Sequence, residues 1–142
     1  MLTPKKVKHR KWQRDRRNMS KMIMDTRGTV LSFGSHGLKS LAYGRITSNQ
    51  IESGRKAMSR FIKKFGKIWI RIFPDRPITK KAPEVPMGGG KGDPCGYCFE
   101  VKPGRIIFEI DGVDDATAQM ALRRAADKLP VKSTIITRMI RT

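Results

Sequence analysis

The chain has 142 residues, of which 38% are apolar, so it can bury one modest core. Lys and Arg number 31 against 12 acidic residues, and this net charge of +19 favours a polyanionic partner, nucleic acid above all. No apolar run approaches a membrane span, and the first residues lack the apolar centre of a secretory signal. We therefore expect a cytoplasmic protein without a membrane partner.

The positive charge is concentrated in the first part of the chain. Residues 1–81 hold 22 of the 31 basic residues and four of the 12 acidic ones, whereas residues 82–142 are nearly neutral. This asymmetry predicts that the polyanion contacts residues 1–81 and that the remainder is mainly scaffold. We expect a basic N-terminal extension over residues 1–27 and a single domain over residues 28–142, with a long internal loop over residues 74–95.

The N-terminal extension contains the dense basic run KKVKHRKWQRDRR and few spaced apolar positions. Such a segment buries too little apolar surface to order itself, and we expect it to become ordered on phosphates rather than remain a solvated tail. Trp12 lies inside the run. Its ring could stack on an unpaired base or cover the protein's own core, and the sequence does not distinguish these.

Residues 29–34 and 37–46 alternate well enough to predict two strands of a hairpin, turning at Ser35 and His36. Thr47 and Gln50 then form a capping-box pattern that predicts a helix ending at Gly66. Its apolar positions follow helical spacing. They are Ile51, Met58, Phe61, Ile62 and Phe65.

The outward face of this helix is predicted to be basic, with only Glu52 against the positive charges. Such one-sided charge lacks the mixed pairing of a merely solvated helix, and it favours contact with phosphates. The basic residues are Arg55, Lys56, Arg60, Lys63 and Lys64. Gly54 in the helix interior is unfavourable by about 1 kcal/mol relative to Ala, which suggests that something packs closely there.

The second half has a similar order of elements. KIWIRIF, residues 67–73, predicts a central strand because both of its faces are substantially apolar, and irregular structure is expected from residue 74 to 94. Residues 97–101 and 105–110 predict a second hairpin, followed by a helix from Asp114 to Pro130 and a strand over 133–139. This order predicts an α+β fold: a two-layer sandwich of a mixed or antiparallel sheet with two helices on one face.

Residues 83–94 read PEVPMGGGKGDP, which raises the possibility of a phosphate-binding loop of an enzyme. A Walker loop requires Ser or Thr after its lysine to hold Mg²⁺, but Gly92 follows Lys91, and a strand follows where a helix would be needed. The glycines instead suit a loop whose backbone approaches another surface closely. No catalytic set of residues stands out, so we expect neither an enzyme nor a cofactor.

Cys95 and Cys98 form half of a zinc-binding pattern, with no second pair in the sequence and both histidines far away. We therefore interpret these cysteines as small apolar residues at the start of a strand and expect no metal.

Several blocks of the sequence together resemble a known family. They are MLTPKKVKHRK, FGSHGLKSL, QIESGRKAMSR, GKIWIRIFPDRPITKKAPEVPMGGGKG, VKPGRIIFEIDGV and ALRRAADKLPVKS. In this order and spacing the chain is similar to bacterial large-subunit ribosomal protein L-sixteen, from Met1 to about Arg138.

The resemblance implies an α+β sandwich embedded in large-subunit ribosomal RNA, near the aminoacyl-tRNA site and the peptidyl transferase centre. It also implies late incorporation during subunit assembly, contact with neighbouring ribosomal proteins and no homo-oligomer. Together with the charge map it gives an rRNA-binding set. This set is Lys5, Lys6, Lys8, Arg10, Lys11, Arg14, Arg16, Arg17, Arg55, Lys56, Arg60, Lys63 and Lys64.

The loop over residues 80–92 is the part that the resemblance places toward tRNA. Its candidate residues are Lys80, Lys81, Met87, Gly88, Gly89, Gly90, Lys91 and Gly92. Pro86 stands where the family usually has Arg, so we expect backbone shape to matter more than side-chain charge in this loop. The alternative to a ribosomal protein is a free protein that binds DNA or messenger RNA, and the ribosome could be bacterial or organellar.

Overall fold

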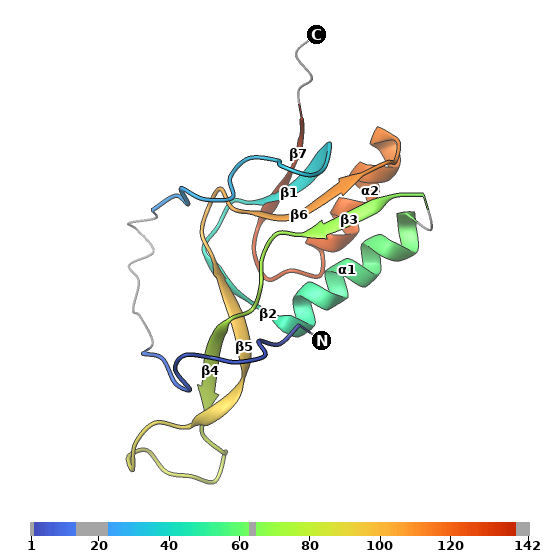
Figure 1. The fold of residues 1–142 in the computed structure, drawn as a ribbon. Coiled ribbons are helices and arrows are strands. Elements are labelled where there is room, and N and C mark those ends of the chain that lie inside the picture. Colours follow the sequence, from blue (N-terminus) through green and yellow to red (C-terminus); the bar gives the residue numbers. More distant parts are fainter. Residues whose placement is uncertain (1, 14–22, 63–64, 139–142) are drawn as a thin grey trace.

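A computed structural model of the chain describes residues 2–13, 23–62 and 65–138. The fold is α+β, as predicted, with all strand pairs antiparallel and the strands divided between two sheets (Figure 1). The elements in chain order are β1 (His36–Ser40), β2 (Gly44–Thr47), α1 (Ser48–Ile62), β3 (Lys67–Ile70), β4 (Arg76–Lys80), β5 (Asp93–Val101), β6 (Ile106–Asp111), α2 (Asp115–Ala126) and β7 (Ser133–Thr137).

The larger sheet has the strand order β3-β6-β1-β7, and both helices cover the same face of it (Figure 1). Residues 106–110 of β6 are all buried, because this strand has a neighbour on each edge and the helices over one face. Phe108 and Leu38 lie fully buried beneath α1 and α2. Ala118, Ala121 and Ala125 are also fully buried, since small side chains let α2 pack closely, as predicted.

The smaller sheet has the order β2-β5-β4 and extends away from the helices (Figure 1). The β4–β5 pair ends at Lys80 and Asp93, which are partners in the register. The yellow connection between them forms the tip of the molecule in Figure 1. The expected irregular segment over residues 74–94 is therefore partly wrong: it contains β4, and the loop is limited to residues 81–92.

The predicted first hairpin is wrong, because residues 29–34 form no strand. Their backbone N–H groups instead donate to a side chain: Ser32, Phe33 and Gly34 all bond the carboxylate of Glu109. The two strands that do form, β1 and β2, belong to different sheets. Alternation of apolar residues did not distinguish a strand from a segment held by one buried carboxylate.

Two further predictions about strand pairing are wrong. The turn at Pro103 and Gly104 forms, but β5 and β6 on either side of it enter different sheets instead of pairing. The strand β3 ends at Ile70 and lies at the edge of its sheet rather than at its centre. Trp69, on the second face of this strand, stacks on Phe33 instead of packing in the core. The sequence pattern did not indicate this contact.

The helix starts are confirmed. The predicted capping box forms: the backbone N–H of Thr47 donates to Oε1 of Gln50 at 2.9 Å, and that of Gln50 donates to Oγ1 of Thr47 at 3.5 Å. Asp114 caps α2 by accepting from the N–H of Thr117 at 3.1 Å. Phe65 was predicted to face the core, yet its side chain is 84% exposed. No helix among the described residues is long and apolar enough to cross a membrane.

Candidate nucleic-acid interface

The N-terminal segment, residues 2–13, runs across the smaller sheet without regular structure (blue in Figure 1). The carbonyl oxygen of Leu2 accepts from Oγ of Ser48 at 2.8 Å at one end, and that of Gln13 accepts from Arg76 at 2.5 Å at the other. The guanidinium of Arg76 also lies 5.4 Å from the centre of the Trp12 ring. Trp12 thus lies against the protein's own surface and not in its core, and it remains 43% exposed. Stacking on an unpaired base, the other alternative, stays a prediction.

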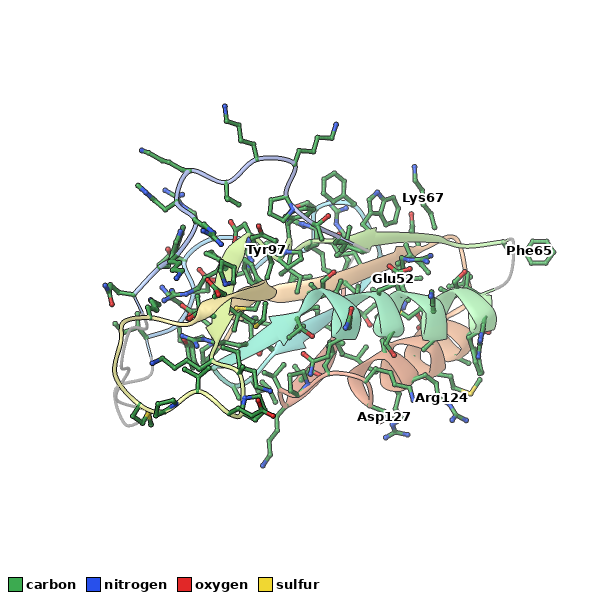
Figure 2. The ribbon with its side chains drawn as sticks, turned by 90° about the horizontal axis from the view of Figure 1, so that it is seen from below. Glu52, Phe65, Lys67, Tyr97, Arg124 and Asp127 are labelled. Carbon is green, nitrogen blue, oxygen red and sulfur yellow. The ribbon has the colours of Figure 1, made fainter. Side chains whose placement is uncertain are left out.

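The side chains of this segment point mostly outward, and Figure 2 shows nitrogen-tipped side chains projecting from the blue trace. Lys5, Lys6 and Lys8 are exposed, and no ion pair involves them among the described residues. Asp93 approaches Arg10 at 3.8 Å and Lys11 at 3.6 Å, but its side chain is largely exposed, so this pairing is weak. Three unpaired ammonium groups in a row can contact successive phosphates.

On α1 the predicted basic face is partly neutralised. Arg55 donates to Glu52 at 2.6 and 3.1 Å, and the hydrogen bond from Arg55 lowers the pKa of the Glu52 carboxyl. Lys56 and Arg60 are exposed and remain available. The other predicted basic residues, Arg14, Arg16, Arg17, Lys63 and Lys64, lie outside the described residues.

The structure does not bring the basic side chains of residues 5–11 next to those on the outer face of α1. Figure 2 shows the blue segment and α1 on different sides of β3. A polyanion that contacted both would have to approach from two directions, which a folded RNA can do and a single straight duplex cannot.

The loop over residues 81–92 takes its shape from glycines and from two lysines. Gly88, Gly89 and Gly90 all have positive φ, at 103°, 68° and 94°, a conformation that other residues rarely adopt. Nζ of Lys81 donates to the carbonyl oxygens of Gly88 and, at 3.4 Å, Pro86. The loop encloses a hollow of about 410 Å³, and the side chain of Met87 is almost fully exposed beside it.

The N-terminal segment also holds the base of this loop. Nζ of Lys11 donates to the carbonyl oxygen of Lys91 at 3.1 Å, and Nζ of Lys91 donates to that of Trp12. Lys91 is therefore a structural connection between the segment and the loop as well as a positive charge. Lys91 and Trp12 lie 79 residues apart in the sequence, so the sequence alone did not indicate this contact.

The two cysteines differ in burial, and His36 lies in a network of polar side chains. Cys98 is buried, which raises the pKa of its thiol, and Cys95 is exposed. Among the described residues, no three His, Cys, Asp or Glu side chains form a group that could hold a metal ion. Oγ of Ser35 lies 3.0 Å from Nδ1 of the buried His36, whose Nε2 contacts Asp115, but Ser35 donates to Asp111 at 2.8 Å. This network joins β1 to the start of α2.

Sequence reasoning missed a third surface. Phe33 stacks on Trp69 next to Lys67 and Arg71, on the face of the larger sheet that the helices leave free. The only available signal was the alternation Lys67, Trp69, Arg71 in KIWIRIF, which we had interpreted as a second buried face.

The comparison with family models gives a match that covers residues 4–136. The model is that of ribosomal protein L16p/L10e. The resemblance seen in the sequence blocks is thereby confirmed over nearly the whole chain.

Proposed function

Because the chain belongs to the ribosomal protein L16p/L10e family, whose members are structural proteins of the ribosome and not enzymes, we propose that it binds large-subunit ribosomal RNA through two surfaces. One is the exposed basic side of residues 5–11, and the other is the outer face of α1 with Lys56 and Arg60. The chain is a structural constituent of the large subunit, and these surfaces are how it would be held there.

The observation that carries this proposal is that Lys5, Lys6 and Lys8 are exposed, with no ion pair to any described residue, on a segment that is itself fixed to the sheet. Contacts to phosphates and 2′-hydroxyls dominate the recognition of folded RNA, so exposed lysines and arginines are the groups needed. Binding would release counterions and depend steeply on salt.

The second part of the proposal concerns the loop over residues 81–92. We infer that it reaches toward aminoacyl-tRNA near the peptidyl transferase centre, and that the chain helps this region to mature during late assembly in the cytoplasm. The support is geometric: the loop is the outermost tip of the smaller sheet, and the basic segment holds its base (Figure 1). Because the N-terminal segment contacts the base of the loop, binding of this segment to rRNA would also fix the direction in which the loop points.

The first test measures retention on large subunits. Tagged chain in cell lysate is run through sucrose gradients at increasing salt, as wild type, as Lys5→Ala/Lys6→Ala/Lys8→Ala and as Lys56→Ala/Arg60→Ala. Both variants should leave the large subunit at lower salt, with a salt slope reduced by roughly one unit per lost phosphate contact. Arg123→Ala/Arg124→Ala removes two exposed charges from α2 and should behave as wild type; Figure 2 shows Arg124 pointing away from the sheets. Wild-type chain at the top of the gradient would indicate a free nucleic-acid-binding protein.

The second test addresses the loop. A photo-crosslinking residue at position 87, whose native Met side chain is exposed, should form cross-links to aminoacyl-tRNA in translating ribosomes. The same residue at position 120, which is exposed on α2, is the control and should form none. Equal tRNA cross-linking from both positions would contradict the placement of the loop while leaving the rRNA proposal intact.

A further inference from the structure

The face of the larger sheet opposite the helices carries an aromatic pair, of which Phe33 is exposed and Trp69 is half-buried. The rings of Phe33 and Trp69 lie 6.0 Å apart between centroids at an interplanar angle of 16°, a nearly parallel arrangement. The side chain of Phe33 is 56% exposed. A ring this open contributes little to the core, so its placement needs another explanation.

A cation lies over each ring. Nζ of Lys67 lies 5.2 Å from the centre of the Trp69 ring, and Cζ of Arg71 lies 5.0 Å from that of Phe33. Lys67 and Trp69 are two residues apart on β3 and so share a face. Figure 2 shows Lys67 pointing away from α1 and α2. We call these four residues, Phe33, Lys67, Trp69 and Arg71, the aromatic platform.

The platform is held in place from below. Glu109 is fully buried, and its carboxylate accepts from the N–H groups of Phe33 at 2.7 Å and Gly34 at 2.8 Å and also contacts Arg71. One carboxylate thus fixes both the backbone that carries Phe33 and the guanidinium beside its ring. Because Glu109 balances Arg71, the exposed Lys67 leaves the platform with a net positive charge.

A groove of about 400 Å³ adjoins the platform, with Arg71 and Phe73 in its wall together with Arg105. The Nε atom of Arg105 is buried and has no hydrogen-bond partner among the described residues. Asp75 is the one acidic residue in the lining. Nη1 of Arg105 also lies 3.7 Å from Asp25 and donates to the carbonyl oxygen of Arg27 at 2.8 Å. The groove therefore offers room for a sugar beside the platform, and the positive charge for a phosphate comes from Lys67.

We propose that the aromatic platform binds one unpaired nucleotide of RNA, whose base stacks on the rings of Phe33 and Trp69 and whose phosphate lies toward Lys67. This rests on the proposed function, in which the polyanion is ribosomal RNA. Aromatic rings with adjacent cations are the usual receptors of unstacked bases. A protein interface would also use Phe, Trp and Arg, but its centre is depleted in lysine, so the exposed Lys67 favours RNA.

The test measures the affinity of full-length chain for two fluorescein-labelled probes by anisotropy. One probe is an oligoadenylate of about five nucleotides, and the other is an abasic ribose-phosphate oligomer of the same length. Trp69→Leu should weaken binding of the oligoadenylate on the order of tenfold and leave binding of the abasic oligomer unchanged. Trp69→Phe keeps a ring and should restore most of the affinity. Phe65→Leu removes an exposed ring that lies just before β3 and outside the platform, and it should change neither.

The outcomes separate this proposal from the one on which it rests. If Trp69→Leu weakens both probes equally, or neither, the platform does not stack a base. That result leaves the retention of the chain on large subunits untouched. In assembled subunits, benzoylphenylalanine at position 33 should cross-link to RNA. Cross-links to a neighbouring protein alone would overturn the proposal, and a thermal melt of each variant distinguishes loss of binding from loss of fold.

Discussion

The carboxylate of Glu109 on β6 accepts a 2.7 Å hydrogen bond from the backbone N–H of Phe33, a residue 76 positions earlier in the chain. Burial alone would raise the pKa of this carboxyl, but the hydrogen bonds from Gly34, Phe33, Arg71 and Ser32 outweigh it and lower the pKa below its ordinary value of 4.5. The ionised form is therefore the one that the fold stabilises.

Replacing Glu109 with Gln should destabilise the protein by roughly 3 kcal/mol at neutral pH, because it leaves the mostly buried Arg71 without its counter-ion. Urea unfolding measures the loss, and Glu84→Gln in the exposed loop is the control. Since the folded-state pKa is depressed, the carboxylate's contribution is complete above the ordinary pKa and is lost as the pH falls through the folded value. The difference between wild type and variant should therefore shrink below about pH 4.5. A difference independent of pH would contradict this role of the charge.

Gly54 should resist replacement even by Ala. A methyl group there would lie 3.1 Å from two atoms of the Phe108 ring, which is fully buried and cannot easily move. The gain in helix propensity of about 1 kcal/mol is then outweighed by overpacking of about 1–3 kcal/mol, so we expect a net loss of roughly 1 kcal/mol. Thermal unfolding tests this against Gly96→Ala, where a methyl group would meet nothing within 4 Å. Higher stability of Gly54→Ala would show that the Phe108 ring can give way.

Arg76 should decide how firmly the N-terminal segment is held. It donates to the carbonyl oxygen of Gln13 and to Glu100, and its guanidinium lies against Trp12. Arg76→Ala should therefore let residues 5–11 detach more often from the sheet, because their local release requires less free energy. Trypsin should then cleave this segment several-fold faster. Arg45→Ala is a matched control, since Arg45 bonds the same Glu100 but is not seen to contact the segment among the described residues. Equal cleavage of both variants would mean that Glu100 alone matters.

The sequence predicted those features that depend on local chemistry. The start of α1 at Thr47 and Gln50, the cap at Asp114 and the alanine face of α2 were all recognised, since each depends on residues within one or two helical turns. The basic side of residues 5–8 was also recognised from composition. These are signals that a single stretch of sequence contains in full.

Long-range pairing was not predictable in the same way. Whether β5 pairs with β6 or with β2 and β4 depends on which sheet each strand joins, and alternation is the same in both cases. The segment around Phe33 resembled a strand because the partner of its N–H groups is a side chain 76 residues away. The aromatic platform was not predicted for the same reason. Trp69 stacks on Phe33, which lies far from it in the sequence, and only the fold brings the two rings together.

The three consecutive glycines of the loop should be required for their backbone conformation and not because a larger side chain would lack space. A Cβ atom at Gly88, Gly89 or Gly90 would meet nothing within 4 Å, yet all three have positive φ. Gly89→Val should therefore distort the loop and slow subunit maturation and translation more than Lys91→Ala, which loses one contact to Trp12. Gly89→Asn is the informative control, because Asn tolerates the left-handed region near φ 68° and should retain most activity. Rates of peptide synthesis and the fraction of mature large subunits measure the effect. A stronger defect in Lys91→Ala than in Gly89→Val would show that the charge of Lys91 and its link to the N-terminal segment are what the loop requires.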